Sequence, residues 1–367
     1  MRIAFLIIVF IHGLLHILGF LKGVGIYEVK ELSLPISKLL AILWLLASFL
    51  LLLYGITFLL STQYAWLVGC IALVLSQILI MLFWNDAKFG TLPNVLILIV
   101  CILSYGQFHF HKMTTRESAS LLNQNQPSKA KIVTPNEIEA LPIPVKTWLQ
   151  NSGAVGKPFI TKGKVIQEAK MKMKPEQEDW MDAKAVQYST IDTPGFIWIV
   201  DVKMNALLNF QGRDQFKNGK GEMLIKLNSL FNVVNEEGKK LDEGTMQRYL
   251  GEMVWFPSLA LSEYITWEKI NDTTALATMD YKGTNASGTF YFNSAGDFVK
   301  FATFRFRDNE ENSRRFEWIL KVDRYKTFEG IKVPSSMSAT WKLENRDWTW
   351  LRLEIKDLKY NENTVSE

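Results

Sequence analysis

Hydrophobic positions gather in four long runs within the first 110 residues, and no later part of the chain resembles them. The runs cover Ile3–Leu21, Leu39–Leu60, Tyr64–Trp84 and Leu92–Phe110. A helix of about 20 apolar residues crosses the ~30 Å hydrocarbon core of a bilayer. The pattern therefore predicts a transmembrane domain of four helices over residues 1–110. The first run is interpreted as a retained helix, because Lys22 follows it where a small-residue cleavage site would stand.

In much of the rest of the chain, apolar and polar residues alternate with a period of two. Val165–Lys174 and Phe196–Val202 alternate as strands do, and Asn218-Gly219 predicts a hairpin turn. Further strands follow closely without intervening helices, which favours an antiparallel sheet. One helix is expected at Glu243–Ser262, ended or kinked at Pro257. The expected fold of residues 134–367 is an α+β soluble domain, a β-rich curved antiparallel sheet packed on a helix.

Between these two parts, residues 111–133 are rich in Ser, Asn, Gln and Lys and hold few apolar residues. This composition is typical of a flexible linker. The predicted organisation is thus a transmembrane domain at 1–110, a linker at 111–133 and a soluble domain at 134–367.

The charged residues are also distributed unequally between these two parts of the chain. Residues 1–110 hold five Lys or Arg and three acids, whereas the remainder holds 36 basic and 34 acidic residues mixed along the chain. Nucleic acid needs a concentrated basic face, so the balance argues against that partner. Both cysteines, Cys70 and Cys101, lie in apolar runs. The soluble part therefore has no disulfide and no thiol nucleophile.

Basic residues flanking the runs bear on orientation. The loops Lys22–Lys38 and Asn85–Gly90 hold four lysines, and the opposite side holds three basic residues, Arg2, Lys112 and Arg116. The positive-inside rule then favours cytoplasmic loops and an extracytoplasmic soluble domain.

A ten-residue stretch, Arg248–Pro257 (RYLGEMVWFP), resembles the signature of an uncharacterised bacterial family of membrane-anchored proteins with a domain of unknown function. The resemblance extends over about Leu141–Tyr360 and includes Phe196-Ile197-Trp198 and Gly330–Pro334 followed by Trp341. It implies an architecture, not a chemistry. The expected location of the chain is a bacterial inner membrane.

Two further likenesses concern other parts of the chain. Trp84–Thr91 and the apolar runs resemble an anchor fused to this domain in Bacteroidetes-type proteins. The Gly330-x-x-x-Pro334 step is similar to one in periplasmic lipoprotein carriers of the LolA type. In those carriers a curved antiparallel sheet wraps a helix and leaves an apolar hollow.

All four histidines lie in or beside the apolar runs. His12 and His16 are spaced i, i+4, as metal ligands on a helix are, but His109 and His111 lie at another depth. Polar groups inside a membrane need partners, so hydrogen bonding to neighbouring helices or a proton-handling role is favoured over metal or haem ligation. Gln77 shares the depth of His16, and a His16–Gln77 hydrogen bond is expected. No metal site or cofactor is predicted.

Candidate ligand-binding residues in the soluble domain are Arg248, Tyr249, Glu252 and Trp255. Arg248 and Glu252 either form a polar group at the mouth of a pocket or a surface ion pair, which is worth ~0.3–0.5 kcal/mol.

Trp341, Trp348 and Trp350 either line a ligand hollow or fill a core, and a core role is the commoner one. Histidine and cysteine are missing from the soluble domain, and no catalytic residue is predicted.

The favoured function is that of a non-enzymatic, membrane-anchored binding protein at the cell envelope. Its expected partners are membrane lipid and an apolar or amphipathic ligand such as a lipid. The alternatives are a membrane enzyme or redox component that uses His12 and His16, and a structural module for envelope interactions. No oligomeric state is indicated.

Overall fold

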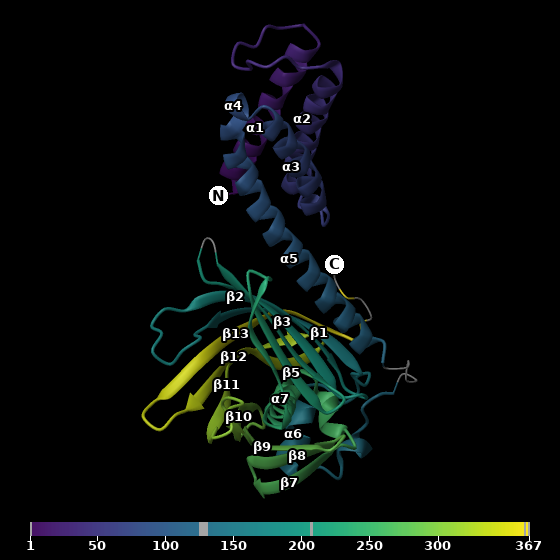
Figure 1. Cartoon of the computed structure of the whole chain (residues 1–367). Coiled ribbons are helices and arrows are strands. Elements are labelled where there is room, and N and C mark those ends of the chain that lie inside the picture. Colours follow the sequence, from purple (N-terminus) through teal and green to yellow (C-terminus); the bar gives the residue numbers. More distant parts are fainter. Residues whose placement is uncertain (1, 125–130, 206–207, 363–364, 366–367) are drawn as a thin grey trace. The chain divides into compact units, whose positions relative to one another are not determined.

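The computed structural model describes residues 2–124, 131–205, 208–362 and 365 (Figure 1). Two compact units make up the chain, Met1–His111 and Lys112–Glu367. The first is helical, and the second is built on a large antiparallel sheet.

Four helices in the described part of the chain are long and apolar enough to cross a membrane, as the sequence predicts. A short helix α4 and a 3-10 turn η1 precede the last of them. The helical elements are α1 (Arg2–Gly23), α2 (Lys38–Leu59), α3 (Ala65–Leu82), α4 (Trp84–Ala87), η1 (Lys88–Gly90) and α5 (Thr91–Leu122).

Small residues allow α1 and α2 to approach closely. A Cβ atom on Gly19 would lie 2.3 Å from the Trp44 indole, so only glycine fits beside that ring. Trp44 itself is buried and packs edge-on against Phe83, 5.8 Å between centroids. Close contact at a small residue is the usual means by which membrane helices gain packing energy.

The segment expected to be a linker differs from that expectation. Helix α5 continues through Leu122, and its residues from Lys112 onward belong to the second unit. Leu121 and Leu122 are buried there, and Glu117 lies 3.2 Å from the guanidinium of Arg213. Residues 112–122 therefore have burial and an ion pair to hold them helical, although their composition is polar. Residues 125–130 lie outside the described part of the chain.

Among the described residues of the second unit, thirteen strands form one sheet. They are β1 (Lys162–Met171), β2 (Met181–Thr190), β3 (Gly195–Lys203), β4 (Asn209–Lys217), β5 (Lys220–Leu227), β6 (Phe231–Glu237), β7 (Ile265–Asn271), β8 (Thr274–Tyr281), β9 (Thr284–Phe292), β10 (Phe298–Phe306), β11 (Arg315–Phe328), β12 (Ile331–Lys342) and β13 (Asp347–Tyr360). The order is β6-β5-β4-β3-β2-β1-β13-β12-β11-β10-β9-β8-β7, and the pairings are antiparallel. The predicted α+β fold with a curved antiparallel sheet is confirmed.

Helical segments accompany this sheet. They are η2 (Pro135–Ile138), α6 (Ile143–Asn151), α7 (Lys239–Gly251), η3 (Glu252–Trp255) and η4 (Pro257–Leu261). Figure 1 shows α6 and α7 on the inner side of the curved sheet. The segment from α7 to η4 joins β6 and β7, which are the two edges of the sheet, so it crosses the hollow between them.

The sheet curls until two of its turns touch. Asn218 and Gly219 have φ of 54° and 77°, the left-handed pair that a tight hairpin requires. The carbonyl oxygen of Gly219 accepts a hydrogen bond from Thr284 Oγ1 at 2.7 Å, and Lys282 Nζ donates to Asn218 Oδ1 at 2.9 Å. The hairpin turns β4–β5 and β8–β9 thus meet around α7.

The crossing segment is shorter in its α-helical part than the sequence predicts. The expected single helix over Glu243–Ser262 is instead α7 followed by two 3-10 turns. Phe256 precedes Pro257 and has φ −130°, ψ 69°, because a residue before proline is disfavoured in the α region. The chain tightens into η3 from Glu252 onward, which turns Trp255 toward β12.

Candidate functional site

Arg248, at the end of α7, is the centre of a buried polar cluster. Its Nε donates to Glu252 Oε1 at 2.7 Å and its Nη1 donates to Asp214 Oδ2 at 2.8 Å. Its Nη2 donates to Gln187 Oε1 at 3.2 Å, and Gln187 Nε2 donates to Glu252 Oε2 at 2.7 Å. The guanidinium also lies 4.6 Å from the ring centroid of Trp198.

Burial sets the energetics of this cluster. The side chain of Arg248 is 14% exposed and that of Glu252 is 9% exposed, so the alternative of a surface ion pair is wrong. Burial raises the pKa of Asp214, although the neighbouring Arg248 opposes that shift. Breaking a buried pair of this kind costs far more than breaking an exposed one, because a charge is left without compensation.

The two aromatic candidates have different surroundings. Tyr249 lies in the core, where its hydroxyl donates to the carbonyl oxygen of Thr190 at 2.6 Å and burial raises its pKa. Trp255 is 1% exposed and donates from Nε1 to the carbonyl oxygen of Pro334 at 3.1 Å. Of the four candidates, Arg248, Glu252 and Trp255 line one cavity.

That cavity lies on the inner side of the sheet and has a volume of about 410 Å³. This value falls within the ~300–1,000 Å³ typical of small-molecule pockets. Met173, Met223 and Met337 contribute soft apolar surface to its wall. Six tryptophans of the described chain also line it, namely Trp198, Trp255, Trp318, Trp341, Trp348 and Trp350. The group Trp341, Trp348 and Trp350 therefore lines a hollow and does not only fill a core.

Four hydrogen-bond donors on the cavity wall are buried without an acceptor. They are Nε of Arg305 and Nε1 of Trp318, Trp348 and Trp350. Leaving a buried donor unsatisfied costs about 1–3 kcal/mol, and each such group in a native protein needs an explanation. The wall is thus apolar with a few convergent donors, which is the usual composition of a ligand site.

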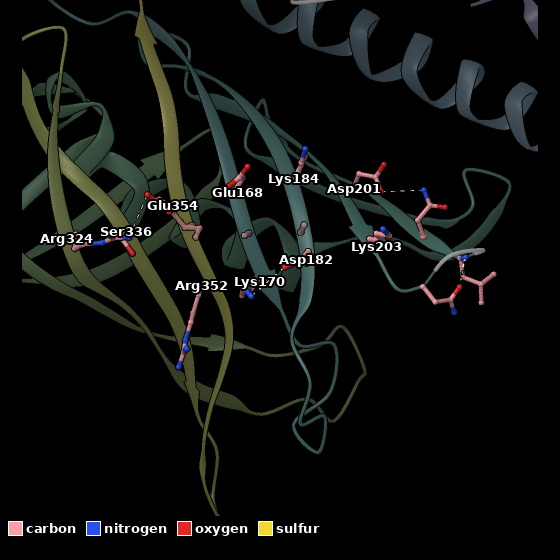
Figure 2. A pocket seen from close by; sticks show the side chains of 16 residues that line it. Glu168, Lys170, Asp182, Lys184, Asp201, Lys203, Arg324, Ser336, Arg352 and Glu354 are labelled. Carbon is pink, nitrogen blue, oxygen red and sulfur yellow. Dashed lines mark hydrogen bonds and ion pairs between the residues drawn. The ribbon is translucent and has the colours of Figure 1, made fainter. Parts of the chain in front are cut away.

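A larger hollow, of about 840 Å³, lies on the outer face of the same sheet. Figure 2 shows acidic and basic side chains side by side there, among them Glu168, Lys184 and Arg352. Several are paired with each other, as Arg324 is with Glu354 at 3.7 Å. Exposed pairs of this kind contribute about 0–1 kcal/mol. This outer groove is a solvated mixed surface, and its residues do not converge on a common chemistry.

The helical unit contains a second polar cluster, around Ser76 of α3. His16 Nε2 lies 2.9 Å from Ser76 Oγ, and His12 Nε2 lies 3.0 Å from Asn94 Oδ1. Asn94 Nδ2 donates to Ser76 Oγ and to Gln77 Oε1, both at 3.0 Å. The expected His16–Gln77 hydrogen bond is wrong, because Ser76 occupies that place and Gln77 bonds Asn94 instead.

The donors and acceptors of this cluster can be assigned without conflict. His16 Nδ1 lies 2.9 Å from the carbonyl oxygen of His12, which can only accept, so Nδ1 carries the hydrogen. In a neutral ring Nε2 then accepts the hydroxyl of Ser76. Both nitrogens of His16 are therefore used, Nδ1 within α1 and Nε2 in a contact with α3. In the described ranges no three His, Cys, Asp or Glu side chains gather to hold a metal ion.

Comparison with known proteins places the second unit. Residues 131–353 match the model of a family of unknown function (DUF6544). The chain belongs to this family. The match confirms the resemblance to an uncharacterised family, and it contains every residue that lines the cavity.

Two other comparisons add no chemistry to the family. The crystal structure of a LolA superfamily protein from Nitrosomonas europaea is similar at a TM-score of 0.32 and 11% identity, over 59% of this chain and 94% of that chain. No match was found among curated proteins.

Several residues of both clusters were not predicted from the sequence. Asp214 and Gln187 come from strands distant in sequence from Arg248, and no local pattern marks them. Ser76 and Asn94 did carry a signal, because every polar side chain inside an apolar helix requires a partner. Arg305 carried a weaker one, as a cation within the alternation of a strand.

Proposed function

We propose that this member of the family is a membrane-anchored binding protein whose soluble unit holds an apolar or amphipathic ligand. The observation that supports this most directly is the cavity of about 410 Å³ under the sheet, lined by six tryptophans and three methionines. Aromatic and methionine side chains present large apolar area and adapt to varied shapes. The four donors without acceptors give the same wall a polar component.

Attachment to four apolar helices supports lipid as the source of the ligand. Covalent linkage to a membrane segment keeps the cavity at a high effective concentration near the bilayer. We place the protein in a bacterial inner membrane, with the soluble unit on the extracytoplasmic side. The four lysines of the interhelical loops support that orientation.

Two other functions stay as alternatives. A membrane enzyme or redox component would use His12 and His16. A structural module would bind no ligand at the Arg248 cluster or at the Ser76 cluster. The contacts of His12 and His16 with Ser76 and Asn94 favour a packing role for these histidines. A haem absorption band, or about one equivalent of metal per chain that disappears in His12→Ala, would favour the enzyme instead.

Extraction of bound lipid from the full chain tests the proposal. The protein is isolated in lipid nanodiscs, and its organic extract is analysed by mass spectrometry. Ala339 is buried on the cavity wall, so Ala339→Phe should fill the cavity, whereas Val233→Phe adds a ring on an exposed strand. We expect one species to be lost with Ala339→Phe and kept with Val233→Phe. The same extract from all three folded proteins would refute a cavity ligand.

Reporter fusions test the orientation. A chain cut after Asn123, just beyond α5, is fused to a reporter active only outside the cytoplasm. Activity of that fusion is expected, and activity of a reporter that works only in the cytoplasm would reverse the assignment.

A further inference from the structure

The polar atoms left unsatisfied on the cavity wall are of one kind. Within the described chain all four are donors, Nε of Arg305 and the indole nitrogens of Trp318, Trp348 and Trp350. The buried acceptors without partners, such as Gln211 Oε1, belong to residues that do not line the cavity. A wall whose fully buried unsatisfied atoms are all donors is complementary to a group rich in acceptors.

Arg305 of β10 is the charged member of this set. Its guanidinium lies 4.8 Å from the ring centroid of Trp318 and 5.4 Å from that of Trp341. A Cβ atom on Gly244 of α7 would lie 2.9 Å from Arg305 Nη2, so a larger residue there would crowd the guanidinium. Stacking on two indoles therefore fixes the side chain, while no hydrogen bond or ion pair joins it to another described residue.

The acids near Arg305 are already engaged. Asp214 Oδ2 and Glu252 Oε1 both accept from Arg248, and Glu252 Oε2 accepts from Gln187. Four basic side chains line the described cavity, namely Lys174, Arg248, Arg305 and Arg307, against these two acids. The wall is thus cationic overall, and a cationic ligand or a neutral polyol would find few free acceptors on it.

We infer that the ligand is an amphipathic anion whose carboxylate or phosphate head binds Arg305 and the indole N–H groups beside it, with its apolar chain against the tryptophan and methionine wall. This inference rests on the proposed function, because it names the head group of the ligand in the same cavity. Guanidinium binds carboxylate and phosphate through paired, charge-assisted hydrogen bonds, which suits a stacked and otherwise unpaired arginine.

Three probes that share a twelve-carbon chain test the head group. Dodecanoate, dodecyl phosphate and 1-dodecanol are titrated into the full chain in nanodiscs at about pH 8, where the carboxylate is ionised. Partition into empty nanodiscs of the same lipid is subtracted. Arg305→Gln removes the charge from the cavity, and Arg324→Gln, on a side chain 67% exposed on the outer face, is the matched control.

We expect at least one anion to bind the wild type about tenfold or more tightly than 1-dodecanol does. Arg305→Gln should abolish that preference, and Arg324→Gln should keep it. The stronger of the two anions identifies the head as carboxylate or phosphate.

The outcomes separate the two proposals. Equal saturable binding of all three probes to the wild type would overturn the anionic head and leave the cavity function standing. No binding of any probe beyond empty nanodiscs would overturn both. The wild-type comparison decides the matter even if Arg305→Gln does not fold. An anion preference that persists in folded Arg305→Gln would mean that a residue other than Arg305 binds the head group.

Discussion

The indole of Trp255 donates to the carbonyl oxygen of Pro334, with 3.1 Å between Nε1 and O. This contact joins η3 to β12, which β2, β1 and β13 separate from β3 in the sheet. One side chain thus fixes the crossing segment to the sheet and forms part of the cavity wall.

Trp255→Ala should destabilise the soluble unit severely. Truncating a buried tryptophan costs about 3–5 kcal/mol, a large share of a typical 5–15 kcal/mol stability. Trp255→Phe keeps most of the buried ring and loses chiefly the hydrogen bond, so its cost should be smaller. Limited proteolysis of the full chain over a temperature series measures both. An Ala variant as resistant as the wild type would show that this segment is not a core element.

Glu252→Gln should lower the melting temperature, although it changes little volume. One oxygen that accepts from Arg248 or Gln187 becomes an amide that donates toward them. An unsatisfied buried group costs about 1–3 kcal/mol, while Arg248 keeps Asp214. Glu354→Gln, at an exposed carboxylate 45% accessible, serves as the control and should be nearly silent. Equal melting of both variants would mean that the Arg248 cluster carries no stability.

Ser76→Ala should destabilise the helical unit by about 1–2 kcal/mol, within the range of hydrogen bonds between membrane helices. The change leaves His16 Nε2 without its partner and removes one acceptor of Asn94. Ser48 of α2 is 2% exposed, and no side-chain hydrogen bond joins it to another described residue, so Ser48→Ala is a matched control. Thermal unfolding in nanodiscs compares the two. A larger loss in the Ser48 variant would contradict this assignment.

Arg305→Met should raise the melting temperature of the ligand-free protein. Burial, with Arg248 nearby, lowers the pKa of Arg305 from 12.5 to about 10. A lowered folded pKa means that the cation is held at a cost below about pH 10, and that the cost disappears as the pH rises toward 12.5. The penalty is on the order of 3 kcal/mol, offset by about 1–2 kcal/mol of lost cation–π attraction.

The expected gain is therefore a few degrees near neutral pH, and it should shrink as the pH rises above about 10 toward 12. Melting curves of both proteins across that range measure it. A variant less stable than the wild type at every pH would show that the stacked guanidinium is a structural element and not one held for a ligand.

Hydropathy alone was sufficient for the four helices, because about 20 apolar residues in succession have few other solutions. Period-two alternation located strands such as β1 and β3, whose inner faces are buried. The edge strand β6 was not predicted. Most of its residues are exposed, so burial imposes no alternation of apolar and polar residues on it. The end of α7 at Gly251 was also missed, since the proline effect reaches back through a 3-10 turn.

The cavity could be predicted only in part. Trp341, Trp348 and Trp350 are close in sequence and suggested a hollow, but Trp198 and Trp318 join them only through the curl of the sheet. The pairing of Arg248 with Asp214, and the lack of a partner for Arg305, depend on which strands face each other. The local sequence does not show which strands face each other.

Photo-crosslinking measures most directly whether the cavity holds an amphipathic ligand. The full chain in nanodiscs is irradiated with a dodecanoic acid that carries a diazirine near its methyl end, and labelled peptides are mapped by mass spectrometry. Labels should fall on peptides that contain Met223, Met337 or Trp348–Leu353, and excess unlabelled dodecanoate should suppress them. Labels confined to peptides from residues 2–111, unaffected by competitor, would contradict the account.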